Sequence, residues 1–103
     1  MDNYANLARE KADQGKVRLS HHAQKERLEE NISTDDIIEA LKSGRELEPY
    51  PDDPRGPSAL IAGQDEQGRW IHVVCGNFDR EYLLIITVYL PQPPKWIDPF
   101  TRG

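Results

Sequence analysis

The segment Glu81–Leu90, EYLLIITVYL, decides how this chain folds, because its side chains alternate between two unlike surfaces. In an extended strand, successive side chains point to opposite faces of the sheet. One face of this segment is apolar throughout, and we expect it to meet a hydrophobic core. The other face ends in the hydroxyl groups of Thr87 and Tyr89. The apolar face carries Tyr82, Leu84, Ile86, Val88 and Leu90.

Two further strands are predicted before this one, over Ala59–Gln64 and Arg69–Gly76. The connections are the four-residue loops Asp65–Gly68 and Asn77–Arg80, and loops this short favour an antiparallel meander. The second loop predicts that Gly76 pairs with Glu81. The register that follows pairs Val74 with Leu83, His72 with Ile85 and Trp70 with Thr87.

This register divides the side chains of the sheet into two groups, because directly opposed residues share a face. The core face is expected to hold Leu60, Ala62, Ile71, Val73 and Cys75 together with the apolar face of Glu81–Leu90. The opposite face is expected to be open, with no helix to cover it. It would carry Ile61, Gly63, Trp70, His72, Thr87 and Tyr89.

The N-terminal part of the chain carries helix signals. Ser20 is placed to cap a helix over His21–Glu30. Ser33 and Asp36 have the spacing of a capping box for a second helix that ends at Gly44. A weaker helical pattern covers Asn3–Asp13.

The prediction is an α+β fold, in which two N-terminal helices pack on one face of a small antiparallel sheet, a meander of three to four strands. Residues 1–16 would form an N-terminal extension with a helical pattern, and residues 17–103 a single domain. Glu46–Tyr50 is the candidate fourth strand. The proline-rich tail from Pro91 cannot continue the sheet and is expected to fold back and pack Trp96.

Composition excludes several classes of protein. The net charge of −5 and the pI near 5.1 argue against a broadly basic nucleic-acid-binding domain. The single cysteine, Cys75, excludes an intrachain disulfide and any multi-cysteine metal site. No apolar run reaches membrane-spanning length, and the start of the chain lacks a signal-peptide pattern, so we expect a cytoplasmic protein without membrane contact.

His72, in the middle of a strand, is a candidate general acid or base, because an ordinary histidine titrates near neutral pH. Thr87 and Tyr89 would lie beside it, and Trp70 on the same face could stack a nucleobase. The structural alternative is an exposed strand histidine with Thr and Tyr neighbours chosen for their β propensity.

The adjacent pair His21 and His22 at the start of the first helix supplies a second candidate. A neutral imidazole there could act as a base, and the alternative is two surface histidines; the sequence does not decide which of the two faces the site. Arg27 is the charged residue expected to lie along the sheet, where it could hold a phosphate or send its stem to solvent. Adjacent histidines do not have the spacing of metal ligands, so no metal and no cofactor are expected.

An ordered set of short motifs resembles one bacterial family, the domain of unknown function 4258. The resemblance extends from about Val17 to Arg102. The motifs are Ser20-x-His22-Ala23, Ile32-Ser33, Asp36-Ile37, Gly44, Tyr50-Pro51-Asp52-Asp53, Gly68-Arg69-x-x-His72-Val73-Val74, Ile86-Thr87-Val88-Tyr89-x-Pro91 and Trp96.

The resemblance implies a fold similar to that of the BrnT and RelE toxin-like ribonucleases, in which the open face of the sheet handles RNA without a metal. By motif, His22, His72, Thr87 and Tyr89 take the recurring polar positions of the family. The chain departs from the pattern where arginines are usual, four and eight residues after the histidine. It has Glu26 and Glu30 there instead, with Arg27 one position away.

Two hypotheses of different classes follow. The first is a metal-independent endoribonuclease of toxin type, with His72 or His22 as base, Arg27 stabilising the phosphate, Thr87 and Tyr89 orienting it, and an antitoxin as partner. The second is a non-catalytic domain that uses the open sheet face to bind a protein or to form a homodimer.

Overall fold

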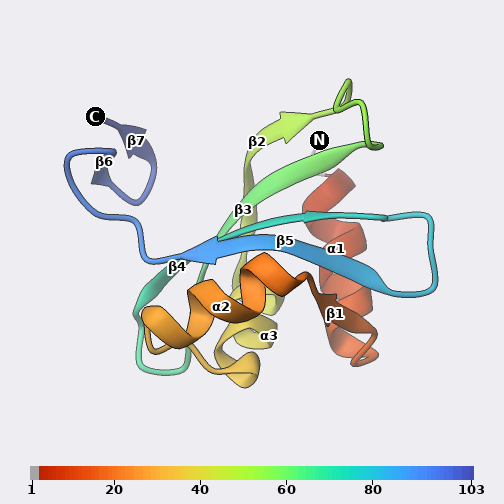
Figure 1. Cartoon of the computed structure of the whole chain (residues 1–103), viewed down its shortest axis with the longest axis horizontal. Helices are drawn as coiled ribbons and strands as arrows, with labels where there is room; N and C mark the ends of the chain where they lie inside the picture. The colour runs from red at the N-terminus through yellow and green to blue at the C-terminus, as the bar shows by residue number, and fades with distance from the viewer. Residues whose placement is uncertain (1–2) are drawn as a thin grey trace.

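A computed structural model describes residues 3–103 of the chain. Its elements follow one another as α1 (Asn3–Asp13), β1 (Val17–Leu19), α2 (His21–Glu29), α3 (Thr34–Ser43), β2 (Arg45–Tyr50), β3 (Ser58–Gln64), β4 (Trp70–Gly76), β5 (Leu83–Tyr89), β6 (Trp96–Asp98) and β7 (Thr101–Arg102). The predicted α+β class is confirmed, and Figure 1 shows the helices gathered on one side of a twisted sheet.

The main sheet has five strands in the order β1-β5-β4-β3-β2. The predicted meander of β3, β4 and β5 is confirmed, and β2 joins it as an antiparallel edge strand. The expectation of a purely antiparallel sheet is wrong, because β1 pairs with β5 in parallel. The sheet is mixed because the chain passes through helices and three other strands between these two neighbours, so no hairpin fixes their relative direction.

The helix boundaries follow from local capping. The Ser20 hydroxyl accepts a hydrogen bond from the Ala23 N–H at the start of α2. Ser33 and Asp36 form the predicted capping box of α3, in which each side chain accepts the other residue's backbone N–H. Asn31, in the turn between the two helices, has a φ of 56°, a left-handed conformation that asparagine tolerates.

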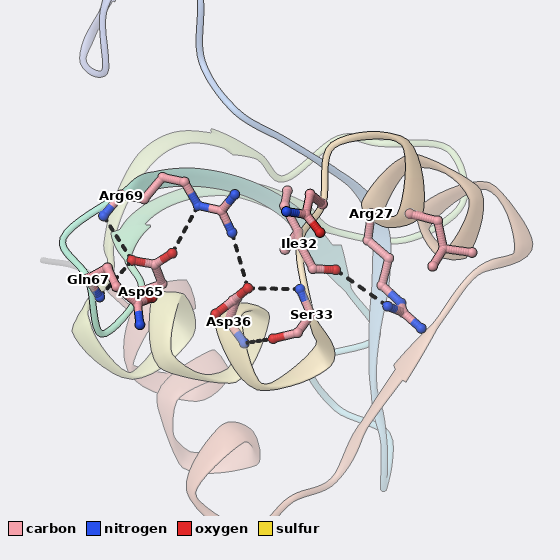
Figure 2. Close-up of a pocket in the computed structure, with 9 residues that line it drawn as sticks. Arg27, Ile32, Ser33, Asp36, Asp65, Gln67 and Arg69 are labelled. Atoms are coloured by element: carbon pink, nitrogen blue, oxygen red, sulfur yellow. Dashed lines mark hydrogen bonds and ion pairs between the residues drawn. The ribbon is translucent and has the colours of Figure 1, made fainter.

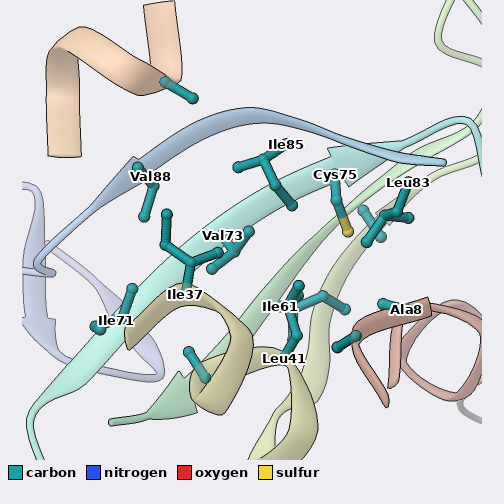
Figure 3. Packing of buried hydrophobic residues seen from close by; sticks show 14 of the residues in the cluster. Ala8, Ile37, Leu41, Ile61, Ile71, Val73, Cys75, Leu83, Ile85 and Val88 are labelled. Atoms are coloured by element: carbon teal, nitrogen blue, oxygen red, sulfur yellow. The ribbon is translucent and has the colours of Figure 1, made fainter. Parts of the chain in front are cut away.

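The hydrophobic core lies between the helices and one face of the sheet, as Figure 3 shows. Helix α3 packs against β3 and β4, and α1 packs against α3. The small side chains of α1 allow this close approach. The central core residues on the sheet are Ile61, Ile71, Val73, Cys75, Leu83, Ile85 and Val88, and Ile37 and Leu41 meet them from α3.

The predicted register between β4 and β5 is wrong. His72 pairs with Tyr89, Val74 with Thr87 and Cys75 with Ile85, so an extra residue, Ile86, forms a bulge. The connection is also longer than expected, because β5 begins at Leu83 rather than at Glu81. A bulge inverts the alternation of side chains on either side of it.

The bulge explains which face assignments failed on β5. Leu83 and Ile85, before it, enter the core in place of Leu84 and Ile86, whereas Val88, after it, lies in the core as predicted. On β3 the assignment is inverted too: Ile61 is in the core, while Leu60 and Ala62 pair with Val74 and His72 and share their face. We call this face, opposite the helices, the second face of the sheet.

The second face is covered around His72, contrary to the expectation of an open surface, whereas Val74 and Thr87 farther along it are half-buried. The chain leaves β5, passes through the proline-rich segment 91–95, and ends in the hairpin formed by β6 and β7 (Figure 1). Trp96 is 1% exposed, so the prediction that the tail folds back and packs this residue is confirmed. The covering element is a hairpin from the C-terminal tail and not a helix.

Candidate functional site

His72 lies on the second face of the sheet, next to Tyr89, and is fully buried under the C-terminal hairpin. Its Nδ1 is 3.1 Å from the Tyr89 hydroxyl, and its Nε2 is 2.7 Å from the Pro99 carbonyl oxygen. The Trp96 ring meets the imidazole edge to face, with 4.5 Å between the ring centroids. Both ring nitrogens are therefore engaged within the protein.

The hydrogen bonds of His72 define the tautomer of its neutral ring. A carbonyl oxygen can only accept, so Nε2 carries the proton and Nδ1 accepts from the Tyr89 hydroxyl. Burial lowers the pKa of His72, against the opposing effects of the Pro99 hydrogen bond and the Glu48 charge. Burial also raises the pKa of Tyr89. Both groups are accordingly neutral at physiological pH.

Beside His72, a carboxylate and a guanidinium meet across the boundary between β2 and the hairpin. Arg102 donates from its Nε and from one terminal nitrogen to the two oxygens of Glu48, each at 2.7 Å. Tyr50 donates its hydroxyl to the same carboxylate at 2.5 Å. The Arg102 side chain is 49% exposed and that of Glu48 is 30% exposed, so solvent reaches both.

These contacts shift the ionisation of all three groups. The hydrogen bond from Arg102 lowers the pKa of Glu48 to about 2, and the bond from Tyr50 contributes to the same shift. Burial and the Glu48 carboxylate raise the pKa of Tyr50 to about 12. The bond to Glu48 raises the pKa of Arg102. Groups with shifted pKa values that converge on one place are candidates for a functional site.

We call these residues the Glu48–Arg102 cluster; its members are Glu48, Tyr50, His72, Tyr89 and Arg102. They come from β2, β4, β5 and β7. Sequence reasoning found His72 and Tyr89 but missed the others. The Glu-Pro-Tyr alternation in Glu48–Tyr50 puts two polar side chains on one face of an edge strand, and this was a signal that could have been used. No local pattern links Arg102 to them.

Trp70, the predicted base-stacking residue, is half-buried at the margin of the second face. Its ring meets Phe100 of the hairpin edge to face, with 4.8 Å between centroids. The guanidinium of Arg45 lies 3.9 Å from the centre of the same Phe100 ring. The aromatic surface of Trp70 is thus partly taken up by the hairpin.

Thr87 and His22 lie together, but apart from His72. Thr87 donates its hydroxyl to the carboxylate of Glu26 on α2, and the other oxygen of this carboxylate is 3.2 Å from Nε2 of His22. The imidazole of His22 is 69% exposed. The structure therefore separates the predicted residues into a buried pair, His72 and Tyr89, and an edge group around Glu26.

Glu26 and Glu30 bind backbone N–H groups at the end of β5 and just after it. Glu26 accepts the Val88 N–H at 3.1 Å, and Glu30 accepts the Leu90 N–H at 3.2 Å. Strand β1, the parallel neighbour of β5, ends at Leu19, which pairs with Ile85. Beyond this point, the N–H groups of β5 have no strand beside them within residues 3–103. The carboxylates satisfy donors that would otherwise need water or another strand.

Arg27 lies in a different place, at the open groove drawn in Figure 2. It donates to Gln24 at 2.8 Å and to the Ile32 carbonyl at 3.4 Å. Across the groove, of about 540 Å³, Arg69 is bound by the carboxylates of Asp36 and Asp65. Arg27 belongs neither to the Glu48–Arg102 cluster nor to the edge group, so it is not placed to assist His72.

No group of three or more His, Cys, Asp or Glu side chains within residues 3–103 could hold a metal ion. Of the helices in the same range, none has both the length and the apolar character needed to cross a membrane.

Comparison with known proteins gives one family. Residues 19–90, more than half of the chain, match the family described as a domain of unknown function, DUF4258. No curated protein and no solved structure matches the chain. The matched range begins at the last residue of β1, contains α2, α3 and β2 through β5, and ends before the C-terminal hairpin. By this match the chain belongs to the DUF4258 family.

Proposed function

We propose that this protein is a cytoplasmic, metal-independent endoribonuclease of toxin type, similar to the BrnT and RelE toxins, whose partner is an antitoxin protein. The observation that supports the proposal is the bidentate Glu48–Arg102 pair, with Tyr50 on the same carboxylate and solvent access to both charged groups. A carboxylate base beside a guanidinium is suited to cleavage of a phosphodiester by its own 2′-hydroxyl.

In the proposed reaction Glu48 takes the proton of the ribose 2′-hydroxyl as the 2′-oxygen attacks phosphorus. The bond from phosphorus to the 5′-oxygen breaks, and that oxygen leaves with a proton from solvent. The products are a 2′,3′-cyclic phosphate and a 5′-hydroxyl. Arg102 stabilises the charge that develops on the pentavalent phosphate, because a guanidinium matches the geometry of two phosphate oxygens.

Substrate binding would itself strengthen the base. The hydrogen bond from Arg102 is the largest cause of the low Glu48 pKa. A phosphate that takes over the donors of Arg102 removes this effect, so the carboxylate pKa rises toward its ordinary value and the group accepts a proton more readily. Tyr50 keeps the carboxylate oriented throughout.

The proposal assigns different roles to the residues expected from the sequence. Tyr89, a member of the cluster, and the half-buried Trp70 on the same face of the sheet would contact phosphate and base. Arg27, at its separate groove, has no role in this scheme. His22, Glu26 and Thr87 form a hydrogen-bonded group that orders the edge of β5.

The test is cleavage of a single-stranded RNA with a fluorophore and a quencher, in the presence of EDTA. Glu48→Gln keeps the size of the side chain but removes the base, and we expect kcat/KM to fall roughly 10²–10⁴-fold. Arg102→Ala should lower it about 10²–10³-fold. Tyr50→Phe should cause a smaller loss of kcat/KM.

Production of the wild-type protein should halt growth of the host, and Glu48→Gln should relieve the arrest.

Arg55→Ala is the matched control, because Arg55 is also an exposed arginine in a surface ion pair, with Asp53. It should cleave RNA like the wild type. Cleavage that persists unchanged in Glu48→Gln, or that appears equally in all preparations, would show that the activity does not come from this cluster. Wild-type protein that leaves every RNA intact would exclude the ribonuclease proposal.

A second candidate function is a non-catalytic domain that binds a protein partner or forms a homodimer. It is favoured by the carboxylates of Glu26 and Glu30, which stand where the family pattern has arginines, and by the net charge of −5. Such a protein would form a stable complex without RNA cleavage. Size-exclusion chromatography with light scattering, combined with the RNA assay, separates the two candidates.

A further inference from the structure

The C-terminal hairpin is a separate structural unit on the second face. Strands β6 and β7 form their own two-stranded sheet, and no ladder joins them to the five-stranded sheet. An isolated two-stranded hairpin is at best marginally stable in water. The order of this hairpin must therefore come from the side-chain contacts that dock it.

Those contacts converge on His72. Pro99, at the tip of the hairpin, accepts from Nε2 at 2.7 Å, and Trp96 packs edge to face on the same ring. The buried Nε1 of Trp96 makes no hydrogen bond of regular geometry within residues 3–103. It lies near enough to Tyr89 to oppose the rise that burial causes in the pKa of that hydroxyl. A buried donor that is imperfectly paired costs free energy in the docked state.

The docked hairpin also carries one half of the Glu48–Arg102 pair. Arg102 belongs to β7, whereas Glu48 belongs to β2, so the pair exists only while the hairpin lies on the sheet. Phe100, in the turn between β6 and β7, packs against Trp70 and Arg45 and adds to the contact between the hairpin and the sheet. The same docking event thus buries His72 and assembles the pair.

We propose that His72 is a positioning residue: its neutral imidazole holds the β6–β7 hairpin reversibly on the second face through the hydrogen bond to Pro99. Docking of the hairpin brings Arg102 to Glu48. We call the contact between His72 and Pro99 the latch. The effect on catalysis depends on the ribonuclease function proposed above, whereas the docking itself does not. His72 would act on the reaction only through Arg102, without contacting the substrate.

The charges around His72 make the latch sensitive to protonation. Glu48 from β2 favours the imidazolium, and Arg102 from β7 disfavours it. Among residues 3–103, β5 presents the neutral Tyr89 hydroxyl to the ring, and the hairpin presents the Pro99 carbonyl at its tip and the Trp96 ring at the start of β6. Burial outweighs the attraction to Glu48, so acidification should favour the undocked state, in which the ring reaches water.

The experiment compares His72→Leu, His72→Gln and His21→Leu by hydrogen–deuterium exchange of the full-length protein. Leucine removes the donor to Pro99, and we expect exchange of the hairpin amides to rise at least about tenfold while the β3–β4 amides stay protected. Glutamine can place an amide N–H near the position of Nε2 and should restore protection in part. His21→Leu makes the same change at an exposed histidine and should leave the hairpin unchanged.

Kinetics give the second readout. His72→Leu should lower kcat/KM for the RNA as Arg102→Ala does, and the double variant should be no worse than Arg102→Ala alone, because both changes remove the same guanidinium. If His72→Leu does not fold, the exchange of the wild-type hairpin, corrected for the intrinsic effect of pH, should still rise selectively as the pH falls below the ordinary histidine value.

The outcomes separate the two proposals. Unchanged hairpin protection in a folded His72→Leu variant, or in acidified wild-type protein when that variant does not fold, would overturn the latch whatever the activity. Loosening of the hairpin together with wild-type protein that cleaves no RNA would retain the latch and reject the ribonuclease. Loss of protection throughout β3 and β4 in His72→Leu, combined with an acid-insensitive hairpin in the wild type, would make His72 an ordinary core residue.

Discussion

At the scale of single residues, His72 illustrates how burial changes the use of a side chain. Its position in the middle of β4 and its closeness to Tyr89 follow from the strand pattern, and both are observed. Its surroundings do not follow from that pattern, because Trp96 and Pro99 come from a segment more than twenty positions away. A histidine that would be an exposed base on an open strand becomes a neutral, buried hydrogen-bonding group.

The stability of the protein should depend on the protonation of His72. Its pKa is lowered in the folded state, so the unfolded chain binds the proton more tightly. The stabilising contribution is complete above the ordinary value of 6.5 and is lost as the pH falls below it. Urea unfolding at about pH 7.5 and about pH 5.5 should show a loss in the wild type. An equal loss in His72→Gln would assign the effect to other groups.

At the scale of elements, α2 takes the place of a strand beside the last part of β5. Its carboxylates, four residues apart on one helix face, meet alternate N–H groups of the strand. The spacing works because four helical residues rise about 6.0 Å and two strand residues cover about 6.8 Å, a small mismatch that flexible glutamate side chains absorb. The helix thereby protects an edge that could otherwise pair with another chain.

Glu26→Ala should destabilise the fold by about 1–3 kcal/mol, because the Val88 N–H and the Thr87 hydroxyl lose a charged acceptor. Glu29→Ala is the matched control on the same helix, since Glu29 is exposed, and it should change the free energy of unfolding by less than about 0.5 kcal/mol. Urea denaturation monitored by circular dichroism measures both. Equal effects of the two substitutions would mean that the carboxylate at position 26 contributes nothing particular.

Contact between α3 and β3 depends on a glycine. A Cβ atom on Gly63 would overlap the carbonyl oxygen of Ala40, a backbone atom that cannot rotate away. Gly63→Ala should therefore cost about 3 kcal/mol or prevent folding. At Gly76 the same change brings the Cβ to 3.2 Å from the Pro57 carbonyl oxygen, so Gly76→Ala should be milder. Thermal unfolding of the two variants would contradict the argument if their order were reversed.

At the scale of the whole molecule, the two faces of the sheet are buried by different means. The helices cover one face with a continuous apolar core, and the hairpin covers the other with Trp96, Phe100 and a cluster of polar groups. Apolar burial is the larger source of folding free energy. We therefore assign stability chiefly to the helix side and the proposed chemistry to the hairpin side.

This division predicts the effect of truncating Ile37, a fully buried residue of α3 at the centre of the core (Figure 3). Ile37→Ala should lower the free energy of unfolding by about 2–5 kcal/mol, because it leaves a cavity. Leu28→Ala removes an apolar side chain that is 68% exposed and should cost less than about 0.5 kcal/mol. Equal losses in chemical denaturation would show that the core is not where the structure places it.

The sequence by itself determined the local elements of this protein: the capped helices α2 and α3, the three strands of the meander and the return of the tail onto Trp96. These depend on neighbouring residues, through capping hydrogen bonds, side-chain alternation and short turns. Only the tertiary structure decided the bulge at Ile86, the parallel pairing of β1 and the meeting of Glu48 with Arg102, 54 positions apart. Such contacts join segments whose relative placement depends on packing of the whole chain. No local sequence pattern predicts that placement.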